Sequence, residues 1–250
     1  MSGRSAIVSG AAQGLGRAFA ECLAAEGYTV IGFDTNPAVT DATSFEGVQA
    51  DVASRADVDR VIELAAARGA LGVIVNNAGT WRRTPVDSPW EQALDDWSFI
   101  MDTNFKGAML LGRAAVPLLK AAGGGHIVNV STYYVLPAKS AGTNQPDTDL
   151  YNASKWALNG FTDAWAKTLA EHDIKVNGLC MGAVDTPMLR GLFPDGELPA
   201  ELGPVMQAGE IAQQLIDVMA SGRTGENFGA WVGEPVALGP ERPIHERITG

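Results

Sequence analysis

Short apolar runs alternate with longer amphipathic segments along most of the chain. The apolar runs are rich in valine and isoleucine, which is typical of buried strands. They occupy residues 5–9, 29–34, 48–50, 72–76, 125–130 and 175–179. Helical patterns occupy residues 14–25, 56–68, 90–119 and 151–171. This alternation predicts an α/β fold, a doubly wound parallel sheet of about seven strands with helices on both faces.

The length and the charge narrow the possible organisation and partners. With 250 residues, 46% of them hydrophobic, the chain is expected to form a single domain over residues 1–250. Its net charge of −11 would repel a polyanion, so no nucleic-acid partner is expected. There is neither a signal-peptide pattern nor an apolar run of membrane-spanning length, so we expect a cytoplasmic protein with no membrane partner. Cys22 and Cys180 lack metal-ligand spacing, which favours reduced thiols and predicts no metal site.

Residues 185–209 form an irregular stretch with four prolines and several large apolar side chains. In open α/β sheets, the loops beyond the carboxyl ends of the strands shape the ligand cleft. This stretch is therefore predicted to be a substrate lid with an apolar inner face. A solvated surface loop is the alternative.

A glycine-rich turn at residues 10–16 follows the first strand and leads directly into a helix. Glycines at such a turn allow a pyrophosphate to approach the backbone and rest on the helix N-terminus. The spacing is G-x-x-x-G-x-G, and the strand–turn–helix context supports a dinucleotide site. The second strand ends at Asp34, whose carboxylate can accept hydrogen bonds from ribose hydroxyls and would repel a 2′-phosphate. Since Gln13 and Thr35 supply no guanidinium, NAD (NADH) is favoured over NADP.

Tyr151 and Lys155 lie four residues apart in the last long helical segment, so they share one face of that helix. A free phenol has a pKa of about 10, and a cation held nearby would lower it. A tyrosine tuned in this way can protonate or deprotonate an alcohol oxygen. The same spacing is common on helix faces without chemistry, so the pair indicates catalysis only beside a hydride carrier.

Together these motifs resemble the short-chain dehydrogenase/reductase family, of the compact single-domain type with a Rossmann-like fold, over residues 5–235. Further matches are Asp51-Val52, which meets adenine in the family, the run from Asn76 to Gly79 after the fourth strand, and Asn104. The cofactor residues that the resemblance implies are Gly10, Gln13, Gly14, Leu15, Gly16, Asp34, Thr35, Asp51, Val52, Asn77, Ala78, Gly79, Tyr151, Lys155, Gly182, Val184 and Thr186.

The resemblance also implies the catalytic roles. Tyr151 would be the general acid for ketone reduction and the general base for alcohol oxidation. Lys155 would bind the nicotinamide ribose and lower the pKa of Tyr151, while Asn104 would anchor a water linking Lys155 to solvent. The family's fourth group is a serine hydroxyl just past the fifth strand. The usual register assigns this role to Thr132, and Ser131 serves instead if the backbone shifts.

Three stretches depart from the family pattern. An insertion around residues 140–148 lengthens the segment before Tyr151, so the pocket entrance there is not predicted by resemblance. Residues 180–182, Cys-Met-Gly, replace a frequent Pro-Gly, and Met181 is expected to face the substrate. The C-terminal tail, residues 236–250, is either a subunit contact or a frayed terminus.

Large apolar and aromatic side chains are predicted to surround the substrate. They are Tyr133, Tyr134, Leu136, Met181, Met188, Leu189, Leu192 and Phe193. Such a pocket suits an apolar secondary alcohol or its ketone, cyclic or terpenoid-like ones included. Residues 81–83, Trp-Arg-Arg, form a basic spot that we interpret as a solvated loop, with a substrate carboxylate contact as the alternative.

The leading prediction is an NAD-dependent alcohol dehydrogenase acting on a small-molecule alcohol or ketone. A carbonyl or 3-oxoacyl reductase using NADPH is the second hypothesis. A non-catalytic dinucleotide-sensing module is the third, and the presence of both Tyr151 and Lys155 disfavours it. The resemblance also implies a homotetramer, or a homodimer, built on the helix faces of residues 90–119 and 151–171.

Overall fold

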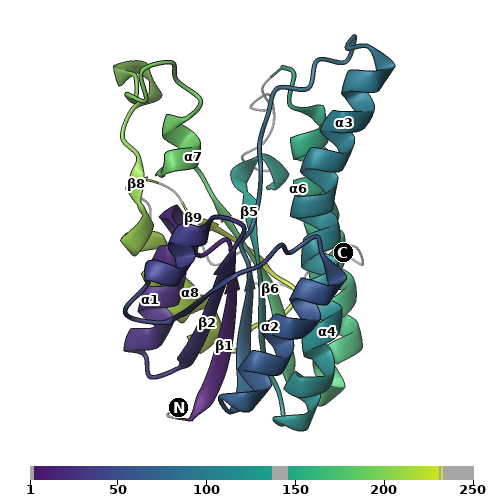
Figure 1. Ribbon diagram of the computed structural model, residues 1–250, viewed down its shortest axis with the longest axis vertical. Helices are drawn as coiled ribbons and strands as arrows, with labels where there is room; N and C mark the ends of the chain where they lie inside the picture. The colour runs from purple at the N-terminus through teal and green to yellow at the C-terminus, as the bar shows by residue number, and fades with distance from the viewer. Residues whose placement is uncertain (1–2, 137–145, 231, 233–250) are drawn as a thin grey trace, which may run out of the picture.

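The computed structural model describes residues 3–136, 146–230 and 232 (Figure 1). Seven strands pair in the order β3-β2-β1-β4-β5-β6-β9, and every pair is parallel. The strands are β1 (Arg4–Ser9), β2 (Thr29–Asp34), β3 (Glu46–Gln49), β4 (Ala70–Asn76), β5 (Gly125–Thr132), β6 (Ile174–Met181) and β9 (Asn227–Ala230). The predicted doubly wound sheet is confirmed.

Helices cover both faces of this sheet, as Figure 1 shows. The helices are α1 (Gly14–Ala25), α2 (Arg55–Ala67), α3 (Trp90–Met101), α4 (Ala108–Ala121), α6 (Asp149–Leu169), α7 (Pro187–Arg190) and α8 (Ala208–Ala220). On one face α1 packs beside α8, and on the other α2 packs beside α4 and α6 packs on β6. The chain order reverses at β1, which lies between β2 and β4, so a ligand cleft is expected beyond the carboxyl ends of these strands.

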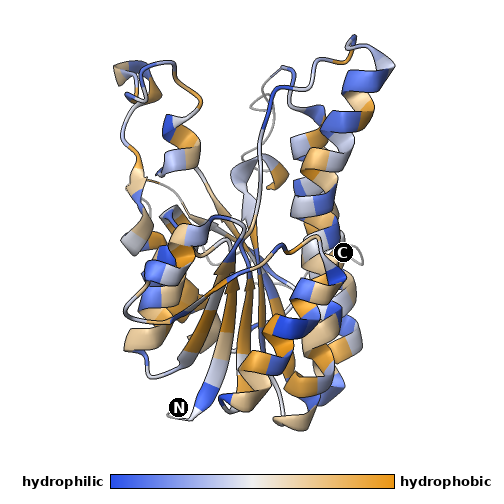
Figure 2. Cartoon of the chain, viewed as in Figure 1, coloured by the Kyte–Doolittle hydropathy of each residue, from blue (hydrophilic) through white to orange (hydrophobic). Residues whose placement is uncertain are grey.

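The core consists of two apolar layers, one on each face of the sheet. Side chains alternate between the faces along a strand, so Val8 packs in the layer with Phe19 of α1, whereas Ile7 packs in the layer with Leu111 of α4. Figure 2 shows the strands as the most continuous hydrophobic part of the chain. Because both faces are buried, the strands read as apolar runs rather than as alternating patterns.

The prediction of one helix over residues 90–119 is wrong in its middle. A π-helical turn, η2 (Asp102–Gly107), separates α3 from α4. Asn104 lies inside this turn, and the side chain of Asn104 is hydrogen-bonded to Thr80 and Ser154. The wider turn coincides with these long-range bonds, and such π-helical turns frequently mark functional sites.

Strand β5 extends further than the sequence pattern predicts. It continues through Ser131 and Thr132, which pair in register with Cys180 and Met181 of β6. The two candidate hydroxyls therefore lie at the end of the strand and not past it. Neighbouring strand residues point to opposite faces, so these two hydroxyls have different surroundings.

Residues 185–209 are more ordered than the predicted irregular stretch. They contain α7, the short helix η5 (Ala200–Leu202) and β8 (Met206–Gln207), which pairs with β7 (Val184–Asp185). Thr186 caps α7 by accepting a hydrogen bond from the Leu189 amide at 3.2 Å. Residues 140–145 of the insertion and the tail at 236–250 lie outside the described residues. Among the helices that the structure describes, none has the length and apolar composition needed to cross a membrane.

Candidate active site

The glycine turn after β1 is closed by direct contact with the end of β4. The Asn77 side-chain amide donates to the carbonyls of Ser9 at 2.9 Å and Gly10 at 3.2 Å. Gly10 has a φ of +70°, in the region that favours glycine. A Cβ atom on Gly16 would lie 1.9 Å from the Gly10 carbonyl oxygen, so no larger residue fits there. The glycines thus hold the turn in a shape that larger residues would break.

The N-terminus of α1 opens onto this turn. No side chain caps it, and its first turn carries no acidic residue. The first backbone amides of a helix lack intrahelical partners and carry partial positive charge. The turn and the helix end therefore form a site suited to an anion such as a pyrophosphate.

Asp34 lies at the end of β2 beside the same turn. One of its carboxylate oxygens accepts a hydrogen bond from the Ala12 amide at 3.1 Å, and the other accepts one from the Asn36 amide at 2.9 Å. The carboxylate is therefore held in place by backbone groups while it lines the cleft. Its remaining lone pairs can accept hydrogen bonds from ligand hydroxyls.

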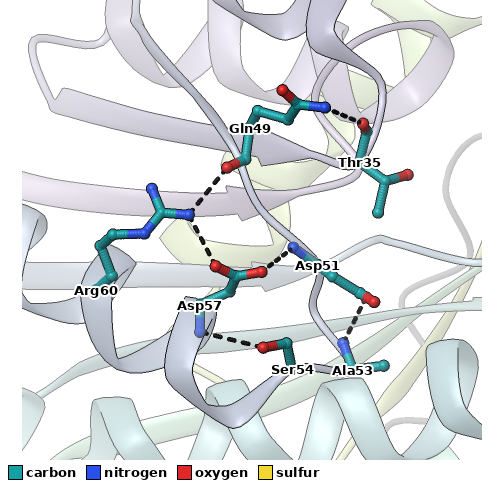
Figure 3. A network of polar contacts seen from close by, with 7 residues as sticks. All are labelled: Thr35, Gln49, Asp51, Ala53, Ser54, Asp57 and Arg60. Carbon is teal, nitrogen blue, oxygen red and sulfur yellow. Dashed lines mark hydrogen bonds and ion pairs between the residues drawn. The ribbon is translucent and has the colours of Figure 1, made fainter.

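Asp51 is held by a network at the start of α2 (Figure 3). Its amide donates to the Asp57 carboxylate at 3.0 Å, and its own carboxylate accepts from the Ala53 amide at 2.8 Å. Ser54 caps the helix by accepting from the Asp57 amide at 3.3 Å. The conformation after β3 is thus fixed by the first turn of α2.

Arg60 links this network to the ends of β2 and β3 (Figure 3). Its guanidinium donates to the Gln49 carbonyl at 2.9 Å and to the Asp57 carboxylate at 2.8 Å. The hydrogen bond from Arg60 lowers the pKa of Asp57. Gln49 in turn donates its side-chain amide to the Thr35 carbonyl at 3.0 Å. One arginine therefore connects the residues predicted to meet adenosine.

Tyr151 and Lys155 lie on α6 at the other side of the cleft. The Lys155 side chain is buried, donates its Nζ to the Val130 carbonyl at 3.0 Å, and places that nitrogen 5.8 Å from the Tyr151 ring centroid. Burial lowers the pKa of Lys155 to about 8 and raises the pKa of Tyr151 to about 12. The shift at Tyr151 is opposite to the expected one, because the loss of solvation around the phenol outweighs the favourable contacts of its charged form.

The two candidate hydroxyls have different partners. The Thr132 side chain lowers the pKa of Tyr151 against the dominant effect of burial. The Ser131 hydroxyl donates weakly to the Lys155 carbonyl at 3.5 Å, and the Ser131 side chain lowers the pKa of the Cys180 thiol against the larger effect of burial. Both hydroxyls thus lie near the catalytic pair, Thr132 by its effect on Tyr151 and Ser131 in the lining of the cleft.

Asn104 is buried behind the catalytic pair, in the π-helical turn. Its Oδ1 accepts from the Thr80 amide at 2.7 Å, and its Nδ2 donates to the Thr80 carbonyl and to the Ser154 hydroxyl, each at 3.0 Å. Ser154 also donates to the Tyr151 carbonyl at 2.7 Å. Asn104 is thus tied directly to the helix that carries Tyr151.

One cleft brings most of the predicted residues together. The predicted residues that line it are Gly10, Gln13, Gly14, Leu15, Gly16, Asp34, Asn77, Gly79, Ser131, Tyr151, Lys155 and Thr186. The predicted residues outside its lining are Thr35, Asp51, Val52, Ala78, Asn104, Thr132, Gly182 and Val184. Val52 is buried against Gly107 of the π-helical turn, where a Cβ atom would lie 2.6 Å from Val52.

Of the eight side chains predicted to surround the substrate, Met181 and Met188 line this cleft. Residues that the sequence did not single out are Val130, whose carbonyl holds Lys155, and Thr80 and Ser154, which hold Asn104. Ser154 could have been singled out from the sequence, because it lies between Tyr151 and Lys155. A role of a backbone carbonyl, such as that of Val130, cannot be predicted from sequence, because every residue has one.

The basic spot after β4 is engaged by acidic side chains. Arg82 donates to Asp95 at 2.7 Å and to the buried Asp96 at 2.9 Å, with its guanidinium 3.6 Å from the ring centroid of Phe99. Arg83 pairs with Asp147 in the segment before Tyr151. These arginines tie the loop after β4 to its neighbours, which argues against the substrate carboxylate contact.

The two cysteines are free, with Cys180 buried and Cys22 half-buried. Among residues 3–136, 146–230 and 232, no three His, Cys, Asp or Glu side chains are grouped to hold a metal ion.

Comparison with known proteins identifies the class of this fold and site. Residues 4–197 match the short chain dehydrogenase family. A trans-4-hydroxycyclohexanecarboxylate dehydrogenase of Sinomonas cyclohexanicum is 33% identical over 242 residues, which cover 90% of this chain and 88% of that protein. The chain therefore belongs to the short-chain dehydrogenase family, and the resemblance seen in the sequence is confirmed.

Two solved structures with nicotinamide dinucleotides share the fold. A 3-ketoacyl-(acyl-carrier-protein) reductase from Brucella melitensis, complexed with NADH, has a TM-score of 0.77 and 25% identity, covering 93% of this chain and 98% of that one. A putative NAD(P)-dependent gluconate 5-dehydrogenase from Beutenbergia cavernae, with bound NADP, has a TM-score of 0.79 and 28% identity, covering 92% of this chain and 95% of that one.

Proposed function

We propose that this protein is an NAD-dependent oxidoreductase that interconverts an apolar secondary alcohol and its ketone. The observation that carries the proposal is that Tyr151 and Lys155 line the same cleft as the glycine turn and Asp34. A proton-transfer group beside a dinucleotide site suits a reaction in which a hydride moves between a ligand and a nicotinamide cofactor.

The residues of the cleft fit a nicotinamide dinucleotide. Gly16 has no space for a side chain against Gly10, and the uncapped N-terminus of α1 offers its amides to a pyrophosphate. Asp34 would hold the adenosine ribose, and Lys155 the nicotinamide ribose. When bound, the nicotinamide supplies the acceptor or donor of a hydride.

The chain itself supplies the proton chemistry and the orientation. Tyr151 would take the hydroxyl proton of an alcohol, or return a proton to the oxygen of a ketone. Thr132, whose side chain lowers the pKa of Tyr151, would hold that same substrate oxygen. Lys155 and Asn104 would complete the path of the proton toward solvent.

We propose NAD rather than NADP because of Asp34. A 2′-phosphate would stand beside a carboxylate whose position is fixed by two backbone amides. Arg17, the first arginine after the glycine turn, pairs with Glu21 at 2.9 Å on the same helix. The site thus offers an acceptor for ribose hydroxyls and a charge that repels a phosphate.

We propose an apolar substrate, because Met181 and Met188 line the cleft and Arg190 is engaged by Asp185 at 2.7 and 3.0 Å. Thr186, Pro187 and Met188 at its edge belong to residues 185–209, which we propose as the lid. The name of the Sinomonas relative describes a cyclic secondary alcohol that also carries a carboxylate, so it supports a cyclic alcohol but not the apolar character of the substrate.

The direct test is absorbance of the reduced nicotinamide on mixing the protein and NAD with secondary alcohols of graded size. We expect turnover with apolar cyclic alcohols and much weaker turnover with sugar phosphates. Tight NAD binding without reduction of NAD by any alcohol, or of the matching ketones by NADH, would contradict the proposal and favour a dinucleotide-sensing module.

A reductase of 3-oxoacyl thioesters is the second candidate. It is favoured by the likeness to the Brucella protein, whose name describes that activity. A short 3-oxoacyl thioester with NADPH distinguishes the two candidates. Faster oxidation of NADPH on this substrate than any reaction on the alcohol panel would place the protein with the reductases.

We also propose that the protein is cytoplasmic and assembles as a homotetramer or a homodimer through α3 and α6. Trp90, Leu94 and Trp97 of α3 are 83, 64 and 52% exposed, and Trp156 of α6 is 43% exposed. Large exposed apolar patches mark interaction surfaces on soluble proteins. Light scattering tests the assembly, and a monomer at micromolar concentration would contradict it.

A further inference from the structure

Tyr151 lies in the first turn of α6. The first amides of a helix have no intrahelical partners, so this turn is held less firmly than the turns that follow. Lys155, one turn further on, is instead buried and donates to the Val130 carbonyl at 3.0 Å. The position of Tyr151 therefore depends on the contacts of the residues just before it, as well as on the bond from Ser154 to its carbonyl at 2.7 Å.

The segment just before the catalytic tyrosine, residues 147–149, is fastened to Thr84 in the loop after β4. The Thr84 amide donates to the Asp147 carbonyl at 2.7 Å, and Thr84 forms a parallel bridge with Thr148. The Thr84 hydroxyl donates to the Asp149 carboxylate. Thr84 and Thr148 are 3 and 4% exposed, so the bridge is shielded from water. A single threonine thus contacts three consecutive residues.

The loop that carries Thr84 is itself held at two further points. Thr80 exchanges hydrogen bonds with the buried side chain of Asn104, at 2.7 and 3.0 Å. Arg82 donates to the buried Asp96 of α3 at 2.9 Å. A loop anchored in this way can serve as a fixed support for the start of α6.

Thr84 lies apart from the groups assigned to the reaction. Among the described residues, the lining of the cleft includes Tyr151 but neither Thr84 nor Asp149. These two line a separate hollow against α3, together with Leu94 and Trp97. A change at Thr84 would therefore reach the reaction through the helix start that carries Tyr151.

We propose that Thr84 is a positioning residue whose bonds to residues 147–149 fix the place of Tyr151 in the cleft. The inference rests on the proposed function, because it takes Tyr151 as the proton-transfer group. A displacement of about 1 Å at a reacting group can lower a rate about 100-fold. A loosened first turn of α6 should therefore slow proton transfer while NAD still binds. The family resemblance does not predict this contact, because residues 147 and 148 belong to the insertion before Tyr151.

Thr84→Val is the critical variant, because it removes the hydroxyl and keeps the side-chain shape and the backbone bonds. We expect kcat to fall between about tenfold and 100-fold, while the Kd for NAD, from fluorescence titration, changes less than about threefold. Thr84→Ser keeps the hydroxyl and should retain kcat within about threefold of the wild type.

Thr162→Val is the matched control, further along α6. The buried Thr162 hydroxyl donates to the Leu158 carbonyl and accepts from the Asn129 side chain, each at 3.0 Å. Its loss should lower stability but change kcat less than about threefold. An equal fall of kcat in Thr162→Val and Thr84→Val would overturn the inference, because any lost hydroxyl on this side of the sheet would then have the same effect.

A further variant tests the contact itself. Asp149→Ala removes the acceptor of the Thr84 hydroxyl, so kcat should fall here too. The double variant should lose little more than the more affected single variant, because both changes remove one shared bond. Losses that multiply would show that Thr84 acts elsewhere and would also overturn the inference.

Hydrogen exchange of the amides of residues 147–152, followed by mass spectrometry, tests the support without any substrate. We expect faster exchange in Thr84→Val than in the wild type and Thr84→Ser. Unchanged exchange would overturn the inference even if an alcohol is oxidised, and so would faster exchange with an unchanged kcat. If neither alcohols nor ketones react with the wild type, the proposed function fails, and the exchange still decides whether Thr84 holds this segment.

Discussion

The two sides of the cleft are built from different kinds of atoms. On the side of β1, β2 and β4, backbone geometry defines the site, as in the close approach of Gly16 to Gly10. On the side of β5 and α6, side chains define it, such as Lys155, whose Nζ donates to the Val130 carbonyl, and Thr132, which lowers the pKa of Tyr151.

The two sides of the cleft should therefore respond differently to substitution. On the side of β1, β2 and β4, a substitution that crowds or distorts the backbone should weaken cofactor binding. The side built from buried side chains holds ionisable groups at a cost in solvation, which shifts the pKa of Tyr151 upward and that of Lys155 downward. Removing one polar atom there should lower kcat while cofactor binding persists.

The largest difference between neighbouring residues is expected at the end of β5. Thr132→Val keeps the shape of the side chain and removes the hydroxyl that we propose to hold the substrate oxygen, so kcat should fall roughly 100- to 1,000-fold, as for other lost donors to a reacting oxygen. Ser131→Ala is the control and should lower kcat less than about threefold. Steady-state kinetics with the best alcohol measures kcat for both variants. A larger loss of kcat in Ser131→Ala than in Thr132→Val would assign the catalytic hydroxyl to Ser131.

A substitution that crowds the glycine turn should weaken NAD binding rather than lower kcat. A Cβ atom on Gly16 would lie 1.9 Å from the Gly10 carbonyl oxygen, so Gly16→Ala must shift the turn. Overpacking costs about 3 kcal/mol or less in most sites, which corresponds to up to about 100-fold in the Kd for NAD. Fluorescence titration measures the change.

Gly209→Ala in α8, where a Cβ atom meets nothing within 4 Å, controls for a general effect of the added methyl group. Wild-type affinity for NAD in folded Gly16→Ala would show that the turn is not the cofactor site.

Cofactor choice should depend on charge at the end of β2. Asp34→Asn keeps the shape of the side chain but removes the negative charge, so the preference for NAD over NADP in kcat/KM should fall about tenfold, as expected for one nearby charge at the surface. Asp41→Asn removes a carboxylate from the neighbouring short helix η1 (Pro37–Asp41) and should leave the ratio unchanged. Equal ratios in the two variants would remove Asp34 from the selectivity.

The smallest effect is expected at the adenosine end. Arg60→Ala breaks the link between Gln49 and Asp57, so KM for NAD should rise about threefold with kcat unchanged, the scale of a partly exposed ion pair. Arg55→Ala on the same helix loses the same charge but only a pair with Asp59. If both variants raise KM for NAD equally, the loss of a positive charge explains the change, and the hydrogen bonds of Arg60 do not.

The features that the sequence predicts well are those that local rules determine. The glycine turn at residues 10–16 and the spacing of Tyr151 and Lys155 follow from strand–turn–helix context and helical periodicity. The sheet follows from the alternation of apolar and amphipathic segments.

The features that it misses depend on contacts between distant residues. The π-helical turn cannot be read from residues 102–107, because the bonds of Asn104 to Thr80 and Ser154 come from elsewhere in the chain. Likewise, the direction of the pKa shift at Tyr151 depends on how deeply the phenol is buried. A pattern that brings a tyrosine and a lysine to one helix face carries no information on burial.

The role of Tyr151 is tested by comparing the wild type with Tyr151→Phe. Both proteins are titrated with NAD and then mixed with the best alcohol, while the absorbance of the reduced nicotinamide is followed. We expect equal NAD affinity, within about threefold, and a kcat at least about 100-fold lower in the variant, since only the proton-transfer group is lost. Turnover within tenfold of the wild type, with NAD bound, would contradict the assignment of Tyr151 as the general acid and base.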